Sequence, residues 1–318
     1  MQHEFKFLNQ LPLNIGNEVT PYLSTPDLLK ISLLSKGHQF FSQSPLEVRK
    51  FLHYIVCGKY GKVLAMLEKD KTLLLKKGSV TDCSGRAFAN ITGFEYALWA
   101  LDKPMWTTIL TCIPPSEENK KILVNLLSQY NNITTKGLTY KLNGQIIRQQ
   151  HFDFTNTIIK ELQTYVNASG APYVPGIKRD WDAVDKQWRE GVGGTQKMLP
   201  MHVVYVYCSE CPMSEFIIQP HSSTQFQNWD DPADTDWFGL NSKLGSDFAI
   251  LKGNGSSTPN KNWCAYAVQN PRQTRGMYQQ NLDSLKELFQ ARRDDFINLK
   301  LLLEQQIAYT NQCNLFQL

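Results

Sequence analysis

The residues best suited to chemistry gather between positions 202 and 221. Two cysteines at Cys-x-x-Cys spacing are flanked by two histidines; the four residues are His202, Cys208, Cys211 and His221. Thiolate and imidazole ligands together can complete the tetrahedral coordination of zinc. The chain has no second Cys-x-x-Cys, however, and the histidine on the far side does not follow the spacing of a zinc knuckle. We therefore predict no metal site and no cofactor.

The same cysteines are also candidates for thiol catalysis. Cys208, Cys211 or Cys264 would supply the nucleophile, and His202 or His221 the base. This chemistry requires a thiolate within hydrogen-bond reach of its partner, which sequence spacing alone does not establish. We predict no catalytic residue, and a cysteine- or metal-dependent enzyme in the C-terminal region stays as an alternative.

Two further segments contain residue types that bind ligands in other proteins. The segment GVGGTQK at 191–197 offers glycine amides and a lysine, but it lacks the Gly-Lys-Ser/Thr ending of a phosphate loop. The segment NWDDPADTDW at 228–237 offers four carboxylates, but without the Gly at the sixth position or the Glu at the twelfth that a calcium loop uses. We interpret the first as a linker and the second as a solvated loop.

Composition excludes several classes of protein. The chain has 318 residues, 42% of them hydrophobic, which is enough to bury a substantial core. The net charge of +4 is spread along the chain without a basic run, so we predict no nucleic-acid partner. Seven scattered cysteines favour a reduced compartment. No apolar run is long enough to span a bilayer, so we expect a soluble, cytosolic protein without membrane insertion.

The N-terminal 44 residues are expected to form three short helices. Pro12, Ile15, Val19 and Leu23 recur at helical spacing. STPD restarts the chain with Thr25 as cap, and SPLE at 44–47 repeats the signal as a capping box. Three helices of this size do not sustain a core by themselves. Their apolar faces must therefore be covered by another surface.

This stretch, from Leu11 to Phe41, resembles an F-box. The resemblance implies that its helices dock on the Skp-type adaptor of SCF ubiquitin ligases. Two positions depart from the pattern: Asn14 stands where an acid is usual, and Pro21 shortens the first helix. The residues expected to contact the adaptor are Leu11, Pro12, Ile15, Val19, Leu23, Leu28, Leu29 and Leu33.

Residues 45–175 are predicted to form a helical region, which includes a capped amphipathic helix from Ser116 to Gln129. Asp82 and Gly85 resemble the turn of an ankyrin repeat, and the segment that begins at Thr92 occupies the place of the repeat's Thr-Pro-Leu-His motif. Two such repeats are fewer than an array needs, and Gly93 replaces the proline. A helical pair merged into a larger domain is therefore expected, with a helical hairpin of no repeat family as the alternative.

Residues 176–318 are expected to form an α+β region. MHVVYVYC, SEFIIQ and DFAILKG indicate short strands of a small sheet. A long amphipathic helix from 278 to 306 follows. The predicted fold class is thus α+β, with an F-box-like module at 1–44, an ankyrin-like middle at 45–175 and this C-terminal region.

The function predicted from these features is that of a non-catalytic adaptor. It would bind a Skp-type adaptor and present an unknown target protein to an SCF-type ligase. The Lys-, Asn- and Gln-rich composition and the order of the modules resemble proteins that intracellular bacteria of the Legionella and Coxiella type inject into host cells. That resemblance implies secretion by the bacterium and work in the host cytoplasm. The alternatives are the C-terminal enzyme and a binding scaffold without ubiquitin chemistry.

Overall fold

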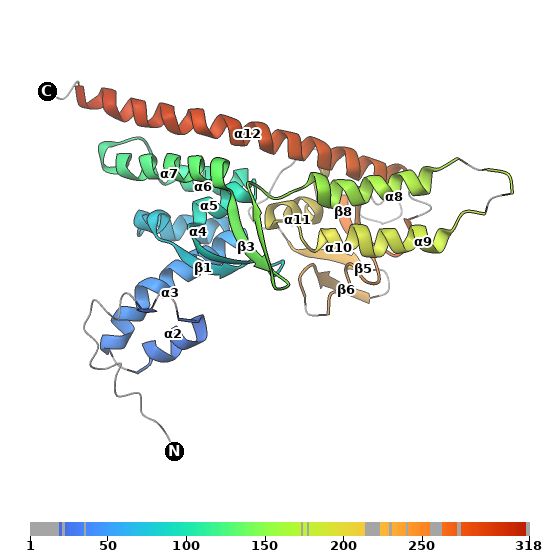
Figure 1. The fold of residues 1–318 in the computed structure, drawn as a ribbon, viewed down its shortest axis with the longest axis horizontal. Helices are drawn as coiled ribbons and strands as arrows, with labels where there is room; N and C mark the ends of the chain where they lie inside the picture. Colours follow the sequence, from blue (N-terminus) through green and yellow to red (C-terminus); the bar gives the residue numbers. More distant parts are fainter. Residues whose placement is uncertain are drawn as a thin grey trace, which may run out of the picture.

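A computed structural model describes most of the chain. The described residues are 19–20, 23–34, 36–172, 174–176, 178–213, 223–228, 231–239, 241–254, 263–271 and 275–315. Within these ranges the fold is α+β, as predicted, with two four-stranded sheets and a long C-terminal helix (Figure 1).

The N-terminal helices begin at one end of the molecule, and the second of them leads into the body beside the first sheet (Figure 1). Helix α2 (Thr25–Ser32) packs against α3 (Lys36–Val56). The helix expected to start at Ser44 instead begins at Lys36 and continues through Pro45. Proline inside a helix removes one backbone hydrogen bond, at a cost of about 3 kcal/mol. Burial of Phe51 and Leu52 in the following turns offsets that cost.

A four-stranded antiparallel sheet lies in the middle region, where only helices were expected. Its strands follow in the order β1 (Gly78–Thr81), β2 (Ala87–Ile91), β3 (Leu138–Leu142) and β4 (Gln145–Gln149). Asn143 and Gly144 join the last two strands with φ of 48° and 83°. Two successive positive φ values define the type I′ turn, whose twist matches that of paired strands.

One helix of the middle region, α5 (Gly93–Trp99), is fully buried. The other helices of this region are α4 (Tyr60–Leu67), η3 (Lys71–Leu75), α6 (Lys103–Thr111) and α7 (Glu117–Lys136). Every residue of α5 is buried, as expected for a helix that is apolar on all sides. Its charged member, Glu95, closes a capping box with Thr92 and pairs with Lys77 at 3.2 Å. The expected helix pair after the turn at Asp82 is therefore present as α5 and α6.

Several short helices lead into the C-terminal region. They are η4 (Thr155–Ile159), α8 (Lys160–Gly170), α9 (Trp181–Lys186), η5 (Gln187–Val192), α10 (Gly193–Gln196) and α11 (Met201–Cys208). The prediction of a strand for MHVVYVYC was wrong, because this segment is α11, buried from Met201 to Tyr207. A continuous apolar run fits a buried strand or a buried helix equally well, so packing decides between them.

The second sheet has the order β6-β5-β8-β7 and contains one parallel pair, β5 with β8. Its strands are β5 (Gln225–Asn228), β6 (Asp231–Asp236), β7 (Ala249–Asn254) and β8 (Trp263–Val268). The strand expected in DFAILKG is confirmed as β7, whereas SEFIIQ lies outside the described residues. The acidic stretch expected as a loop provides β6, an edge strand, where a proline is tolerated.

Side-chain amides cover the backbone of β7 that faces away from β8. Gln196 accepts from the Ile250 N–H and donates to the Ile250 carbonyl, both at 2.7 Å. Asn281 accepts from the Lys252 N–H at 3.0 Å and donates to the Lys252 carbonyl at 2.5 Å. The two amides thus provide hydrogen bonds to backbone groups on the edge of β7 that does not pair with β8.

The glycines at 191–197 pack closely and do not form the expected linker. A Cβ on Gly193 would lie 2.7 Å from the Phe248 carbonyl oxygen and 2.9 Å from Gly245. Glycine is therefore required here by the approach of two backbones.

The long helix α12 (Arg275–Leu315) joins the two halves, running over α7 at one end and α8 and β7 at the other (Figure 1). The expected stripe is buried at Leu282, Leu285 and Leu288 and again at Leu299 and Leu303. One continuous cluster of buried apolar side chains extends from Val48 to Leu303. The division at residues 44 and 175 stays a prediction.

Candidate functional site

The residues predicted to dock on the adaptor divide into three groups. Leu11, Pro12 and Ile15 lie outside the described residues. Leu28 is fully buried and Leu23 half-buried, so these two hold the module together. The exposed group is Val19, Leu29 and Leu33.

The start of helix α2 is capped by a serine and is held to α3 by hydrogen bonds from one arginine. Ser24, not Thr25 as expected, caps the helix by accepting from the Asp27 N–H at 3.2 Å. Arg49 of α3 donates to the Thr25 hydroxyl at 2.8 Å and to the Leu23 carbonyl. Together with buried Leu28, these bonds fix the orientation of α2, and therefore which of its residues face solvent.

Large apolar side chains face solvent on this module. Leu29 is 51% exposed, Leu33 85% and Leu34 59%. Residues 29 and 33 are four apart, so they lie on one side of the helix end. With Val19, which is 41% exposed, these leucines form what we name the N-terminal apolar surface.

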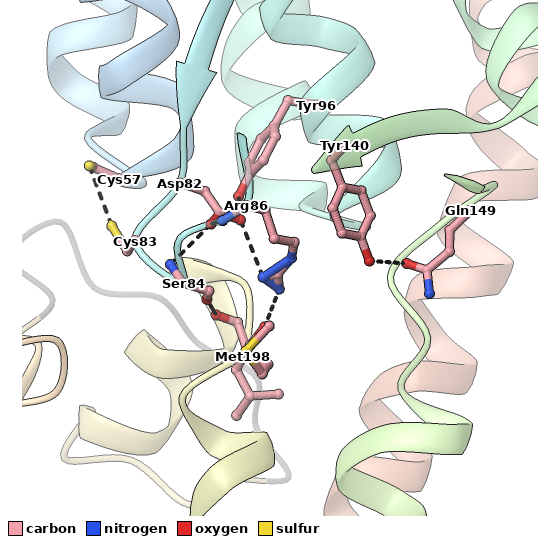
Figure 2. Close-up of polar contacts among 10 residues, drawn as sticks. Cys57, Asp82, Cys83, Ser84, Arg86, Tyr96, Tyr140, Gln149 and Met198 are labelled. Carbon is pink, nitrogen blue, oxygen red and sulfur yellow. Dashed lines mark hydrogen bonds and ion pairs between the residues drawn. The ribbon is translucent and has the colours of Figure 1, made fainter. Parts of the chain in front are cut away.

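A buried ion pair occupies the turn between β1 and β2 (Figure 2). Asp82 accepts from the Ser84 and Arg86 N–H groups at 3.0 and 2.9 Å and from the Tyr96 hydroxyl at 3.4 Å. The Arg86 guanidinium lies 3.3 Å from the Asp82 carboxylate. Burial raises the pKa of Asp82, and Arg86 opposes that shift.

Arg86 also joins the middle region to the C-terminal region. It donates to the Met198 carbonyl (Figure 2). Its guanidinium lies 5.1 Å from the ring centroid of Trp99 and 5.2 Å from that of Phe152. A desolvated cation over aromatic faces is stabilised by their quadrupoles. The residue is 1% exposed, so the arrangement is structural and offers no entry for a ligand.

His202, a candidate ligand and base, lies in a different buried cluster from the cysteines. Its Nδ1 is 4.0 Å from a carboxylate oxygen of Asp102, and within the described residues neither ring nitrogen has a hydrogen-bond partner. Burial lowers the pKa of His202, and Arg292 lowers it further. Burial also raises the pKa of Asp102 to about 7, and Tyr60 donates to its other oxygen at 3.4 Å.

The predicted cysteine candidates do not assemble into a site. Burial raises the pKa of the Cys208 thiol to about 12, which disfavours the nucleophilic thiolate. His221 and the Cys264 side chain lie outside the described residues. Across the ranges that the structure describes, no three His, Cys, Asp or Glu side chains are placed to hold a metal ion. Nor does any helix of those ranges have the length and apolarity to cross a membrane.

Sequence reasoning missed a pair of thiols at the end of α3. The Sγ atoms of Cys57 and Cys83 lie 3.6 Å apart, although the residues are 26 positions apart (Figure 2). No local spacing rule connects such residues. Only the packing of the β1–β2 turn against the end of α3 brings them together.

A groove of about 430 Å³ runs between α6 and α12. Trp106 and Leu110 of α6 and Leu299 and Leu302 of α12 line it. Lys103 and Asp295 lie in its wall and form an ion pair at 2.7 Å. Near the groove, α12 also exposes Ile297, Leu301 and Tyr309.

Comparison with known proteins places this α+β chain in a bacterial family. Residues 157–303, from η4 to α12, match the family described as the CBUA0006 C-terminal domain. The uncharacterized protein CBUA0006 of Coxiella burnetii is 32% identical over 275 residues, covering 79% of this chain and 73% of the relative. The chain therefore belongs to the family of CBUA0006. No solved structure matches it.

Proposed function

We propose that this protein is a substrate-recruiting adaptor. Its N-terminal module binds a Skp-type adaptor, and the rest of the chain presents a target protein to an SCF-type ubiquitin ligase. The ligase supplies the chemistry, and the protein supplies proximity. The relationship to a Coxiella protein supports the further proposal that it is a bacterial effector working in a host cell.

The observation that carries the proposal is the N-terminal apolar surface. Single exposed leucines are common, but several gathered on one short module indicate an interaction site. Leu29, Leu33 and Leu34 are all at least half exposed, while Leu28 beside them is buried. The module therefore uses part of its apolar set for its own packing and leaves the rest for a partner.

The identity of the partner rests on the order of residues that resembles an F-box, which implies that Leu29 and Leu33 are docking positions. Burying a leucine side chain contributes about 1.5–3 kcal/mol. Truncating Leu29 and Leu33 to alanine should cost about 3 kcal/mol in total, a loss in affinity of about 100-fold.

The test is binding of the purified full chain to a purified Skp-type adaptor, measured by titration calorimetry. We expect a complex with the unaltered chain and about 100-fold weaker binding for Leu29→Ala/Leu33→Ala. The matched control is Ile297→Ala/Leu301→Ala, because those residues on α12 are 58% and 55% exposed but lie far from α2. The control should bind normally.

Two results would overturn the proposal. One is no complex with the unaltered chain. The other is equal affinity for the chain and the Leu29/Leu33 variant. Thermal unfolding of the variant should change little, because exposed side chains contribute little to stability, and this separates loss of docking from loss of fold.

A further inference from the structure

Two half-buried thiols face each other where α3 meets the first sheet. Cys57 directly follows α3, and Cys83 lies in the turn between β1 and β2 (Figure 2). Their Sγ atoms are 3.6 Å apart. A disulfide bond is about 2.0 Å long, so the two atoms need to approach by only about 1.5 Å.

We propose that Cys57 and Cys83 form a reversible thiol–disulfide site that reacts with small disulfides of the oxidised-glutathione class. The site is independent of the N-terminal apolar surface and therefore of the proposed adaptor function.

The surroundings of the pair assign different roles to the two sulfurs. The hydrogen bond between the two thiols lowers the pKa of Cys57, and Lys59 lowers it further, against the effect of burial. The same bond and burial raise the pKa of Cys83. Both ring nitrogens of His53 lie 3.8 Å from the Cys57 Sγ, on the exposed side of the pair. Cys57 is thus the attacking thiolate, since the thiolate is the nucleophile.

The reaction proceeds by two exchanges. The Cys57 thiolate attacks one sulfur of the external disulfide, whose S–S bond breaks and releases one thiolate. Cys83 then loses its proton and attacks the Cys57 Sγ of the mixed disulfide, releasing the second thiolate. The two protein thiols are oxidised to one disulfide, the external disulfide is reduced to two thiols, and the two protons pass to the leaving thiolates.

The bond would tie α3 to the turn that carries the buried ion pair. Ser84 of this turn donates to the Leu199 carbonyl at 3.5 Å, and Asp82 holds Arg86 toward the Met198 carbonyl. The thiol pair therefore lies where the end of α3 packs into the body of the protein.

The test is incubation of the full-length native protein with oxidised glutathione, followed by alkylation of the remaining thiols and peptide mass spectrometry. We expect a cross-linked peptide joining Cys57 to Cys83 and the loss of two titratable thiols, both reversed by dithiothreitol. Cys57→Ser and Cys83→Ser should each lose the cross-link. Cys112→Ser is the matched control, because Cys112 is a half-buried thiol at a helix end and should leave the cross-link unchanged.

The unaltered protein decides the outcome even if a serine variant fails to fold. Absence of the Cys57–Cys83 peptide, or a mixed disulfide that persists on Cys57, overturns the proposal. A cross-link between Cys208 and Cys211 in its place does so too, and the double variant Cys208→Ser/Cys211→Ser is expected to keep the Cys57–Cys83 bond.

Discussion

Replacing Arg86 with methionine should remove a large part of the protein's free energy of unfolding. The substitution keeps an unbranched apolar side chain but leaves the buried Asp82 carboxylate without its counter-ion and the Met198 carbonyl without its donor. Removing one partner of a buried pair typically costs 3–5 kcal/mol. We expect about 4 kcal/mol, a large part of the 5–15 kcal/mol that stabilises a typical domain.

The loss should depend on pH. Burial already raises the pKa of Asp82, and the guanidinium opposes that shift. Without Arg86 the folded-state pKa rises further above the unfolded value of about 3.9. The folded variant then binds more protons than the unfolded chain, so its stability falls as the pH rises above about 4, by up to about 1.4 kcal/mol per unit.

Urea denaturation at pH 5 and pH 8 measures both effects. The double variant Asp82→Asn/Arg86→Met should recover part of the loss, because it removes the uncompensated charge as well. Lys186→Met is the control, since Lys186 and Glu190 form an exposed pair worth less than about 1 kcal/mol. A loss below 1 kcal/mol for Arg86→Met, or strictly additive losses in the double variant, would refute this reasoning.

Two further substitutions test the C-terminal packing and the buried histidine cluster. Burial raises the folded-state pKa of Asp102 to about 7, above the roughly 3.9 of the unfolded chain. The free energy of unfolding should therefore fall as the pH rises from about 4 to 7, by about 4 kcal/mol in all. Asp102→Asn keeps an oxygen that can cap the Met105 N–H and should flatten this pH dependence in urea titrations; an unchanged slope argues against it. Asn281→Ala leaves the Lys252 N–H and carbonyl without their side-chain partner and should cost about 1–3 kcal/mol, whereas the exposed Gln280→Ala should cost less than about 0.5 kcal/mol. Equal losses for the two alanine variants in thermal unfolding would contradict the role of Asn281.

Local signals of helix starts predicted some helices and misplaced others, such as the helix expected to start at Ser44. Ser116 caps α7 as predicted, accepting from the Asn119 N–H at 3.3 Å. The stripe at Leu282, Leu285 and Leu288 is buried in α12 as predicted. Such signals act within a few residues, so a single sequence contains them in full.

Part of the first sheet, the hairpin of β3 and β4, could have been predicted from the sequence. Asn143-Gly144 between TYKL and QIIR is the strongest short-range signal of a hairpin. The pairing of β2 with β3 is different, because Phe88 and Tyr140 lie opposite each other across three intervening helices. No local pattern specifies such a contact. Packing likewise decided that MHVVYVYC forms a helix and not a strand.

The candidate sites also depend on packing between distant residues, which the local sequence does not specify. Exposure of Leu29 beside buried Leu28 depends on how α2 sits on α3, which Arg49 fixes from 26 residues beyond Leu23. The F-box resemblance marked both leucines alike. The Cys57–Cys83 pair depends on a contact between the end of a helix and a turn, whereas the sequence pattern singled out Cys208 and Cys211 by their spacing.

The geometry of α3 connects the two proposals. Its 21 residues make a rod of roughly 30 Å, with the N-terminal apolar surface near its first turns and Cys57 directly after its last. An adaptor that works by proximity needs a defined distance and direction between its docking surface and the body that holds the target. In this chain that direction is set by the packing of the second half of α3 against β1, α4 and α5. A disulfide at the end of this helix would not touch the docking leucines, so oxidation should leave affinity for the Skp-type adaptor unchanged.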